Sequence, residues 1–256
     1  MALPPIPERR PRLILHADAS RDVAAGLALS VELAVALQME IAALFIVEDA
    51  SIDACGLPFP THIGFSGRAL TLDPARLERL IRREAEACRR MLAEAAARRA
   101  LAWSFESRRG EPAALLRAEA AAHDIVVVRL DGVGGGTHRT IGQARALAPS
   151  HGGVLFVPVD RGPRRGPVVI LARSSQEGER TADVALSLAQ ALGVAVDHVV
   201  LAGPGRAAGV APLSRTASLM VVSTDSPLLD DEATLRRLVV GLGAPLLVLR
   251  AAPDRT

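Results

Sequence analysis

The stretch Asp124–Gln143 reads D-I-V-V-V-R-L-D-G-V-G-G-G-T-H-R-T-I-G-Q. Its four consecutive apolar residues, Ile125 to Val128, are typical of a strand in a parallel sheet that is covered on both faces. A loop with four glycines follows, and a helix is predicted from about Thr140. A strand that leads through a glycine loop into a helix N-terminus is where α/β folds bind phosphate groups, because the backbone can approach closely and the helix dipole favours an anion.

Composition excludes several classes of function. The chain has 256 residues, half of them apolar, which is enough for one large domain or two small ones. It contains no lysine, so a P-loop lysine, a pyridoxal Schiff base and a lysine nucleophile are excluded. The net charge is only +2, which argues against nucleic acid as a partner. No run of 18 uncharged apolar residues occurs, so neither a membrane span nor a membrane partner is expected.

The reactive side chains predict no catalytic or metal site. Cys55 and Cys88 lack metal-ligand spacing and are expected to be reduced thiols. The six histidines are scattered, and no pair has the helical spacing of metal ligands. The first residues, M-A-L-P-P-I-P-E-R-R-P-R, lack the apolar core of a secretion signal. A cytoplasmic location is therefore expected.

Strands and helices alternate along the first part of the chain. The expected strands are residues 13–17, 41–47, 103–107, 125–128 and 153–159, and the expected helices are residues 23–37, 74–99 and 112–122. Residues 50–71 contain two prolines and three glycines and are expected to be a long loop. This alternation predicts a parallel sheet with right-handed crossovers.

A shorter version of the pattern follows a Pro/Gly-rich linker at residues 160–167. The expected strands are residues 168–172, 194–201, 219–223 and 245–250, and the expected helices are residues 180–192 and 230–242. The second part thus looks like a trimmed copy of the first that lacks one strand and its helices. The predicted organisation is a flexible tail (1–12), a first domain (13–159), the linker and a second domain (168–251).

Five motifs in order carry a resemblance to a known family. They are a first strand ending in D-x-S at Asp18, a second ending in V-E-D from Val47, G-E-P-A from Gly110, the D-I-V-V-V strand and a closing V-L-F-V-P strand. Residues 12–159 resemble a universal stress protein domain. The resemblance implies two such α/β domains in tandem, of the adenine nucleotide alpha hydrolase type with an open five-stranded parallel sheet, the second one degenerate.

The nucleotide-binding members of this family carry G-x-x-G, nine residues, and then G-[S/T]. In this chain Gly132 and Gly142 match that pattern, whereas Arg129 replaces the first glycine and Gln143 replaces the hydroxyl residue. The resemblance implies that Asp18 lies near the adenine and ribose. The implied nucleotide contacts are Asp18, Val47, Arg129, Gly132, Gly142 and Gln143.

The resemblance leaves two hypotheses open for a non-catalytic stress-response protein. It could sense ATP or AMP through the first domain only, or it could be a nucleotide-free interaction protein whose old pocket Arg129 fills. An ATP-hydrolysing or adenylating enzyme is a weaker alternative. Arg173 and the glycine-free S-T-D-S loop from Ser223 predict no nucleotide site in the second domain. The implied partners are an unknown protein and a second subunit, the latter as a homodimer or as an intramolecular pseudo-dimer.

Overall fold

A computed structural model describes residues 10–17, 23–48, 61–63, 69–71, 74–130, 152–158, 166–172, 174–200, 216–226, 229 and 243–250. The strands are β1 (Arg12–Ala17), β2 (Glu40–Val47), β3 (Thr61–Ile63), β4 (Ala69–Thr71), β5 (Trp103–Arg109), β6 (Ile125–Leu130), β7 (Gly153–Pro158), β8 (Val168–Ala172), β9 (Val196–Val200), β10 (Leu219–Ser223) and β11 (Leu246–Leu249). The helices are α1 (Val23–Ala36), α3 (Pro74–Arg98), α4 (Pro112–Glu119) and α6 (Ser175–Leu192).

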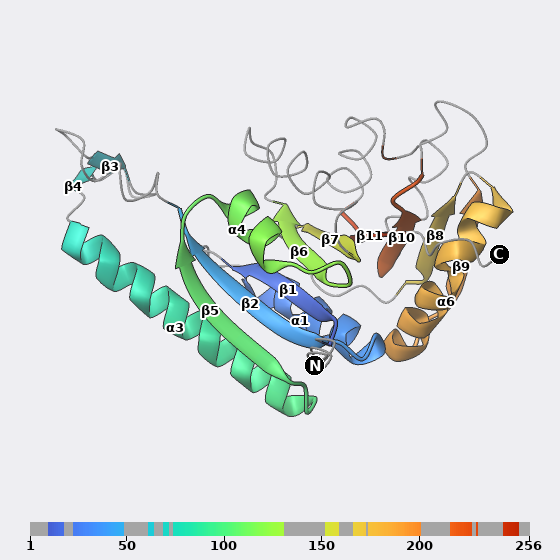
Figure 1. The fold of residues 1–256 in the computed structure, drawn as a ribbon, viewed down its shortest axis with the longest axis horizontal. Helices are drawn as coiled ribbons and strands as arrows, with labels where there is room; N and C mark the ends of the chain where they lie inside the picture. Colours follow the sequence, from blue (N-terminus) through green and yellow to red (C-terminus); the bar gives the residue numbers. More distant parts are fainter. Residues whose placement is uncertain are drawn as a thin grey trace, which may run out of the picture.

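Nine strands form one continuous sheet in the order β5-β2-β1-β6-β7-β11-β10-β8-β9 (Figure 1). The strands from β5 to β7 pair in parallel, and so do those from β11 to β9. The two sets meet at β7 and β11, which pair antiparallel, with Phe156 opposite Leu246. The sequence therefore predicts the mostly parallel α/β class correctly, but the two sets of strands share one sheet.

The two sets of strands repeat one order. Outward from the antiparallel pair, β7, β6, β1 and β2 correspond to β11, β10, β8 and β9, and only the first set continues to β5. Since β7 and β11 run in opposite directions, and since α1 and α6 contact each other on one face, the two sets are related by an approximate two-fold rotation normal to the sheet.

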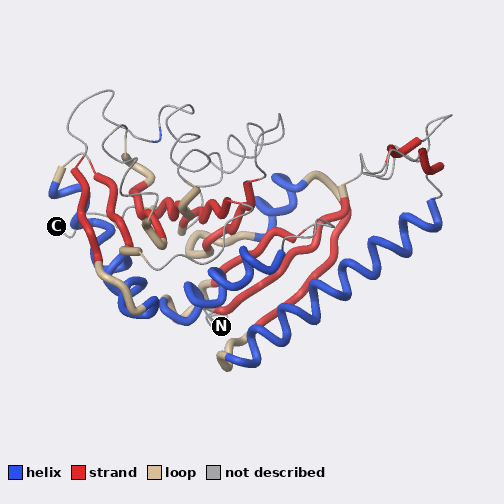
Figure 2. Tube along the Cα trace, turned by 180° about the vertical axis from the view of Figure 1, so that it is seen from behind, coloured by secondary structure: helices blue, strands red, loops and turns tan. Residues whose placement is uncertain are grey.

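Both faces of the sheet are covered, as the uninterrupted apolar strands predict. Leu15 of β1 and Val127 of β6 pack into a cluster with α1, α3 and α6, which lie on one face (Figure 2). Ile14 and Val126, one residue earlier in each strand, pack into the cluster on the other face, to which α4 contributes Leu116. The first cluster also includes Leu188 of α6, so a single core runs through both sets of strands.

Three helices end in the same hydrogen-bonded motif. After α1, the N–H of Met39 donates to Ala34 O and the N–H of Gln38 donates to Val35 O. The same two bonds follow α3 and α6. The motif needs a left-handed residue, and Gln38, Ala100 and Gly193 adopt φ values of 54°, 51° and 65°. Of these three residues only Gly193 is a glycine, which adopts this conformation without steric cost.

A buried ion pair fixes the amino-terminal ends of β1 and β6. Asp124 precedes β6 and is 2 % exposed, and Arg12 begins β1 and is 3 % exposed. Asp124 accepts hydrogen bonds from the Arg12 backbone N–H at 2.8 Å, from Arg12 Nη2 at 2.9 Å and from the N–H of Ala121 at 3.0 Å. The prediction that Arg12 belongs to a flexible tail is therefore wrong, because the side chain of that residue is held in the core.

The same network reaches the outer strand of the first set. Arg12 Nη1 donates to Glu119 Oε1 at 2.8 Å, and Arg108 Nη2 of β5 donates to Glu119 Oε2 at 3.2 Å. Arg108 also donates to both carboxylate oxygens of Glu106, at 2.7 and 3.0 Å. This side-chain hydrogen bond lowers the pKa of Glu106, which keeps the exposed pair on β5 charged.

All nine expected strands of the main sheet are confirmed, and the differences lie at element ends and in one loop. The expected long loop contains the short antiparallel pair β3 and β4. Helix α6 begins at Ser175 rather than Arg180, because the Ser174 side chain accepts the N–H of Glu177 and so caps the helix earlier. Helix α4 ends at Glu119 rather than Ala122. The helices expected from Thr140 and at residues 230–242 lie outside the described residues.

Candidate functional site

The strand order places a topological switch point between β1 and β6. From β1 the chain moves outward to β2 and β5 and then returns to pair β6 on the other side of β1, with Leu15 beside Val127. Ligands of open α/β sheets bind beyond the carboxyl ends of the strands at such a point. Asp18 comes in sequence directly after β1, and Gly132 follows two residues after β6. The two predicted parts of the site, Asp18 and the glycine loop, therefore follow two adjacent strands, β1 and β6.

Two of the six predicted site residues lie in the described part of the chain. Val47 is the last residue of β2 and is half-buried. Arg129 lies near the end of β6, also half-buried, opposite Val157 of β7. Asp18, Gly132, Gly142 and Gln143 lie outside the described residues.

The side chain of Arg129 lies against α1. Alternate residues of a strand share one face, so Arg129 lies on the same face of β6 as Ile125 and Val127, the face that α1 covers. A Cβ atom at Gly26 of α1 would lie 3.6 Å from Arg129 Cδ and 4.0 Å from Leu15 Cδ1. Nε and Nη1 of Arg129 are buried. The arginine therefore occupies the space between the carboxyl end of β6 and the first turns of α1, beside β1.

The equivalent turn of the second set of strands uses its own backbone donors. After β10, the N–H of Thr224 donates to Leu249 O at 2.7 Å, that of Asp225 to Ser223 Oγ at 3.3 Å, and that of Ser226 to Ser223 O at 3.0 Å. Ser223 and Ser226 are each 1 % exposed. Donors engaged in this way are not available to an anion.

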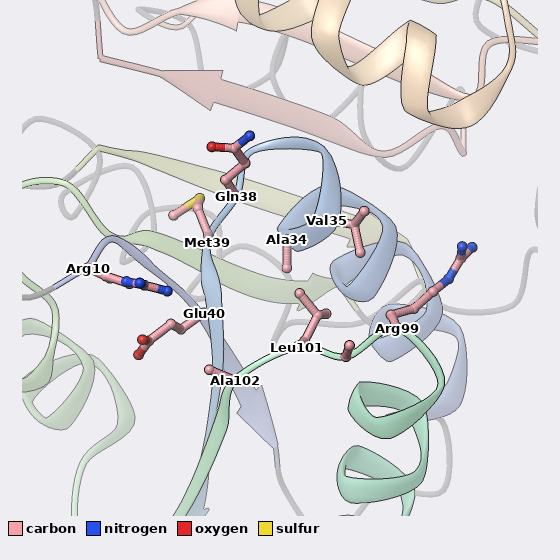
Figure 3. Close-up of a pocket in the computed structure, with 10 residues that line it drawn as sticks. Arg10, Ala34, Val35, Gln38, Met39, Glu40, Arg99, Leu101 and Ala102 are labelled. Atoms are coloured by element: carbon pink, nitrogen blue, oxygen red, sulfur yellow. The ribbon is translucent and has the colours of Figure 1, made fainter.

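A pocket of about 250 Å³ lies at the amino ends of the strands, opposite to the switch point (Figure 3). Glu40 at the start of β2, Arg10 before β1, and the ends of α1 and α3 line it. Arg99 pairs with Glu32, and Figure 3 shows it directed away from the other lining residues. Because this pocket faces the amino ends of the strands, it is separate from the switch point.

Other ligand chemistry has little support in the part of the chain that the structure describes. No group of three or more potential metal ligands occurs there. Cys88 is a buried thiol, whereas Cys55 lies outside the described residues. None of the described helices is both long and apolar enough to span a membrane.

The Arg12–Asp124–Glu119 network was missed in the sequence, although it had a signal. Asp124 directly precedes the apolar strand at Ile125, and Arg12 directly precedes that at Leu13. Charged residues at the amino ends of two parallel strands become neighbours when those strands pair. Only the pairing of β1 with β6 reveals that they meet.

Known structures share this architecture. A universal stress protein from Archaeoglobus fulgidus DSM 4304 superposes with a TM-score of 0.60 at 11 % sequence identity, over 94 % of this chain and 97 % of that one. A functionally unknown protein from Pseudomonas aeruginosa PAO1 has a TM-score of 0.53 at 12 % identity, over 93 % of this chain and 92 % of that one. A protein provisionally named a universal stress protein, from P. aeruginosa UCBPP-PA14, has a TM-score of 0.57 at 10 % identity, with 94 % of each chain covered.

No protein-family model matches the sequence, and no curated protein matches it either. The structural alignments cover more than nine-tenths of this chain, so they include both sets of strands. The expectation from the sequence motifs agrees with these superpositions. The chain therefore has the fold of the universal stress proteins.

Proposed function

We propose that this chain is a non-catalytic stress-response protein that regulates by protein contact, and that Arg129 fills its former nucleotide site. The stress-response role rests on the names of the structural neighbours. The filled site rests on one observation, the packing of the Arg129 side chain against α1 with Nε and Nη1 buried. A bound nucleotide would have to displace this side chain or share the space with it.

We also infer that the second set of strands is a degenerate copy that acts as a built-in partner. The strand order of the first set recurs in the second, and the two copies join through the antiparallel strands β7 and β11. An intramolecular pseudo-dimer of this kind buries the edge of β7, which would otherwise offer unpaired backbone groups to another chain.

Adenine-nucleotide sensing is the second candidate function. It is favoured by the retained Gly132 and Gly142 and by the pairing of β1 with β6, whose carboxyl ends lead into Asp18 and the glycine loop. In this alternative the guanidinium of Arg129 would turn toward a phosphate, where arginine can donate two parallel hydrogen bonds.

Thermal denaturation and calorimetric titration with ATP and with AMP, each with and without magnesium, test the two candidates. A ligand at a hundred times its dissociation constant stabilises a fold by about 2.7 kcal/mol, so binding would raise Tm visibly. The filled site predicts no shift of the wild-type Tm at millimolar nucleotide. A clear shift would support the sensor and contradict the filled site.

Variants show whether Arg129 is the cause. Arg129→Gly combined with Gln143→Ser restores the family pattern and should create binding if these two changes abolished it. Arg117→Ala removes an exposed arginine of α4 and serves as the control. If the restored variant binds no nucleotide either, the site was lost through other residues, and Arg129 is not what excludes the ligand.

A further inference from the structure

The strand β9 ends the sheet without an outer neighbour in the described part of the chain. Among the described strands, β9 pairs with β8 alone. Its counterpart β2 is flanked by β5, which the chain builds from residues 48–124 between β2 and β6. Among the described residues, no strand takes the place of β5 beside β9.

The register shows which backbone groups of β9 face outward. Val168 of β8 lies beside Val196, and its N–H donates to Ala195 O. In a parallel pair this places the backbone groups of Ala195, Asp197 and Val199 toward β8. Those of Val196, His198 and Val200 therefore point away from the sheet, along its open edge.

Two valines of β9, Val196 and Val200, lie on the α6 face of this edge. Val196 packs partly into the core under α6, and Gly178 of α6 lies against the imidazole of His198. Val200, on the same face of β9, is 45 % exposed. Apolar side chains beside unpaired strand groups are typical of a surface that another strand covers.

The opposite edge of the sheet is protected. Glu106, Arg108 and Arg109 lie on β5, and α3 packs alongside it (Figure 1). Charged side chains on an edge strand oppose pairing with another chain. By contrast, β9 carries a single charged side chain, Asp197, and neither arginine nor proline. The β9 edge is therefore less protected against pairing than the β5 edge.

We propose that β9 is the surface through which two copies of this chain form a dimer, by antiparallel pairing of β9 with β9 of the second copy. A two-fold axis normal to the sheet at His198 sets Val196 opposite Val200 of the second copy and His198 opposite itself. This register uses every outward backbone group of the strand, in three doubly hydrogen-bonded pairs. It also brings apolar side chains together on the α6 face.

A second copy fits this edge better than an unrelated strand. The edge is self-complementary, since valine lies opposite valine at both ends of the pairing. Antiparallel pairing about a two-fold axis normal to the sheet is also how the chain joins its own two sets of strands at β7 and β11. The dimer would repeat that arrangement at the outer end of the second set and leave the protected β5 edges at its ends.

Sedimentation velocity and light scattering of the full chain over a range of concentrations test the proposal. The wild type should have twice the mass of one chain. His198→Pro removes one outward N–H from each copy, and proline is tolerated on an edge strand when its missing N–H faces solvent. It should reduce the mass to that of one chain. His198→Thr keeps the N–H and should remain dimeric.

A second pair of variants decides the matter if the proline variant does not fold. Val200→Lys sets a charge on the proposed interface and should abolish the dimer, whereas Val35→Lys, at a residue of α1 that is 36 % exposed, should not. A wild type that stays monomeric at every concentration overturns the proposal. So does a dimer that persists in Val200→Lys, because the interface would then lie elsewhere.

Discussion

Single residues at the join between the two sets of strands leave little room for change. At Gly153 of β7 an added Cβ atom would lie 2.6 Å from the carbonyl oxygen of Val248 in β11, a backbone atom that cannot turn aside. At Gly26 of α1 the nearest neighbour would be 3.6 Å away, which is ordinary van der Waals contact. The close approach of β7 and β11 therefore requires glycine at position 153, whereas α1 has room for a larger residue at position 26.

We expect Gly153→Ala to lower the free energy of unfolding by about 1–3 kcal/mol, the usual cost of overpacking a rigid site. Gly26→Ala should raise it by about 0.5–1 kcal/mol, because alanine favours a helix interior more than glycine does. Urea denaturation of both variants measures the difference. A neutral Gly153→Ala would mean that β7 and β11 can separate freely.

Among the elements, β1 and β6 depend on a buried carboxylate at their amino ends. Asp124 accepts three hydrogen bonds, two from Arg12 and one from Ala121. Removing one member of a buried ion pair leaves the other charged and without its partner, which costs more than the pair itself contributes. The pairing of these two strands, and with it the switch point at their other ends, rests on this network.

We expect Asp124→Ala to destabilise the protein by about 3–5 kcal/mol. The matched control is Glu78→Ala, which breaks the pair with Arg82 on the outer side of α3, where the two side chains are 67 % and 77 % exposed. Solvent screens such a pair, so the control should leave Tm nearly unchanged. Equal effects of the two variants in thermal denaturation would show that the buried network contributes nothing special.

For the whole molecule, the shared core predicts that both sets of strands unfold together. The cluster under the helices joins residues of α1, α3 and α6, and α1 contacts α6 directly. Trp103 is the single tryptophan and lies on β5, at the far end of the sheet from α6. Its fluorescence therefore reports unfolding at one end of the molecule after a change at the other.

We expect Leu188→Ala, at a fully buried position of α6, to lower the midpoint of the Trp103 transition in urea, with a loss of about 2–5 kcal/mol. Leu186→Ala on the same helix removes a side chain that is 55 % exposed, and it should change stability by about 0.5 kcal/mol or less. A Trp103 transition unaffected by Leu188→Ala would show that the two sets unfold independently.

Much of the architecture followed from local pattern alone. Runs such as Ile125–Val128 and Leu219–Val222 are apolar throughout because both faces of a parallel sheet are covered, so the inner strands could be predicted from them. The two edge strands, β5 and β9, carry polar residues and were predicted from the alternation of strands and helices. The start of α3 at Pro74 was predicted from the Asp-Pro pair, because proline suits the first helical position. The early start of α6 also had a local signal, the spacing of Ser174 and Glu177, which was overlooked.

The candidate site depended on contacts that local pattern does not contain. The sequence identified Arg129 as a departure from the family motif, but whether it would reach a ligand or pack inward depended on Gly26, which approaches only when α1 folds over β6. The join between β7 and β11, the pair of Arg12 with Asp124 and the open edge of β9 likewise arise between segments far apart in the chain. Alternation of apolar residues specifies a strand, whereas its neighbours are chosen by the packing of the whole sheet.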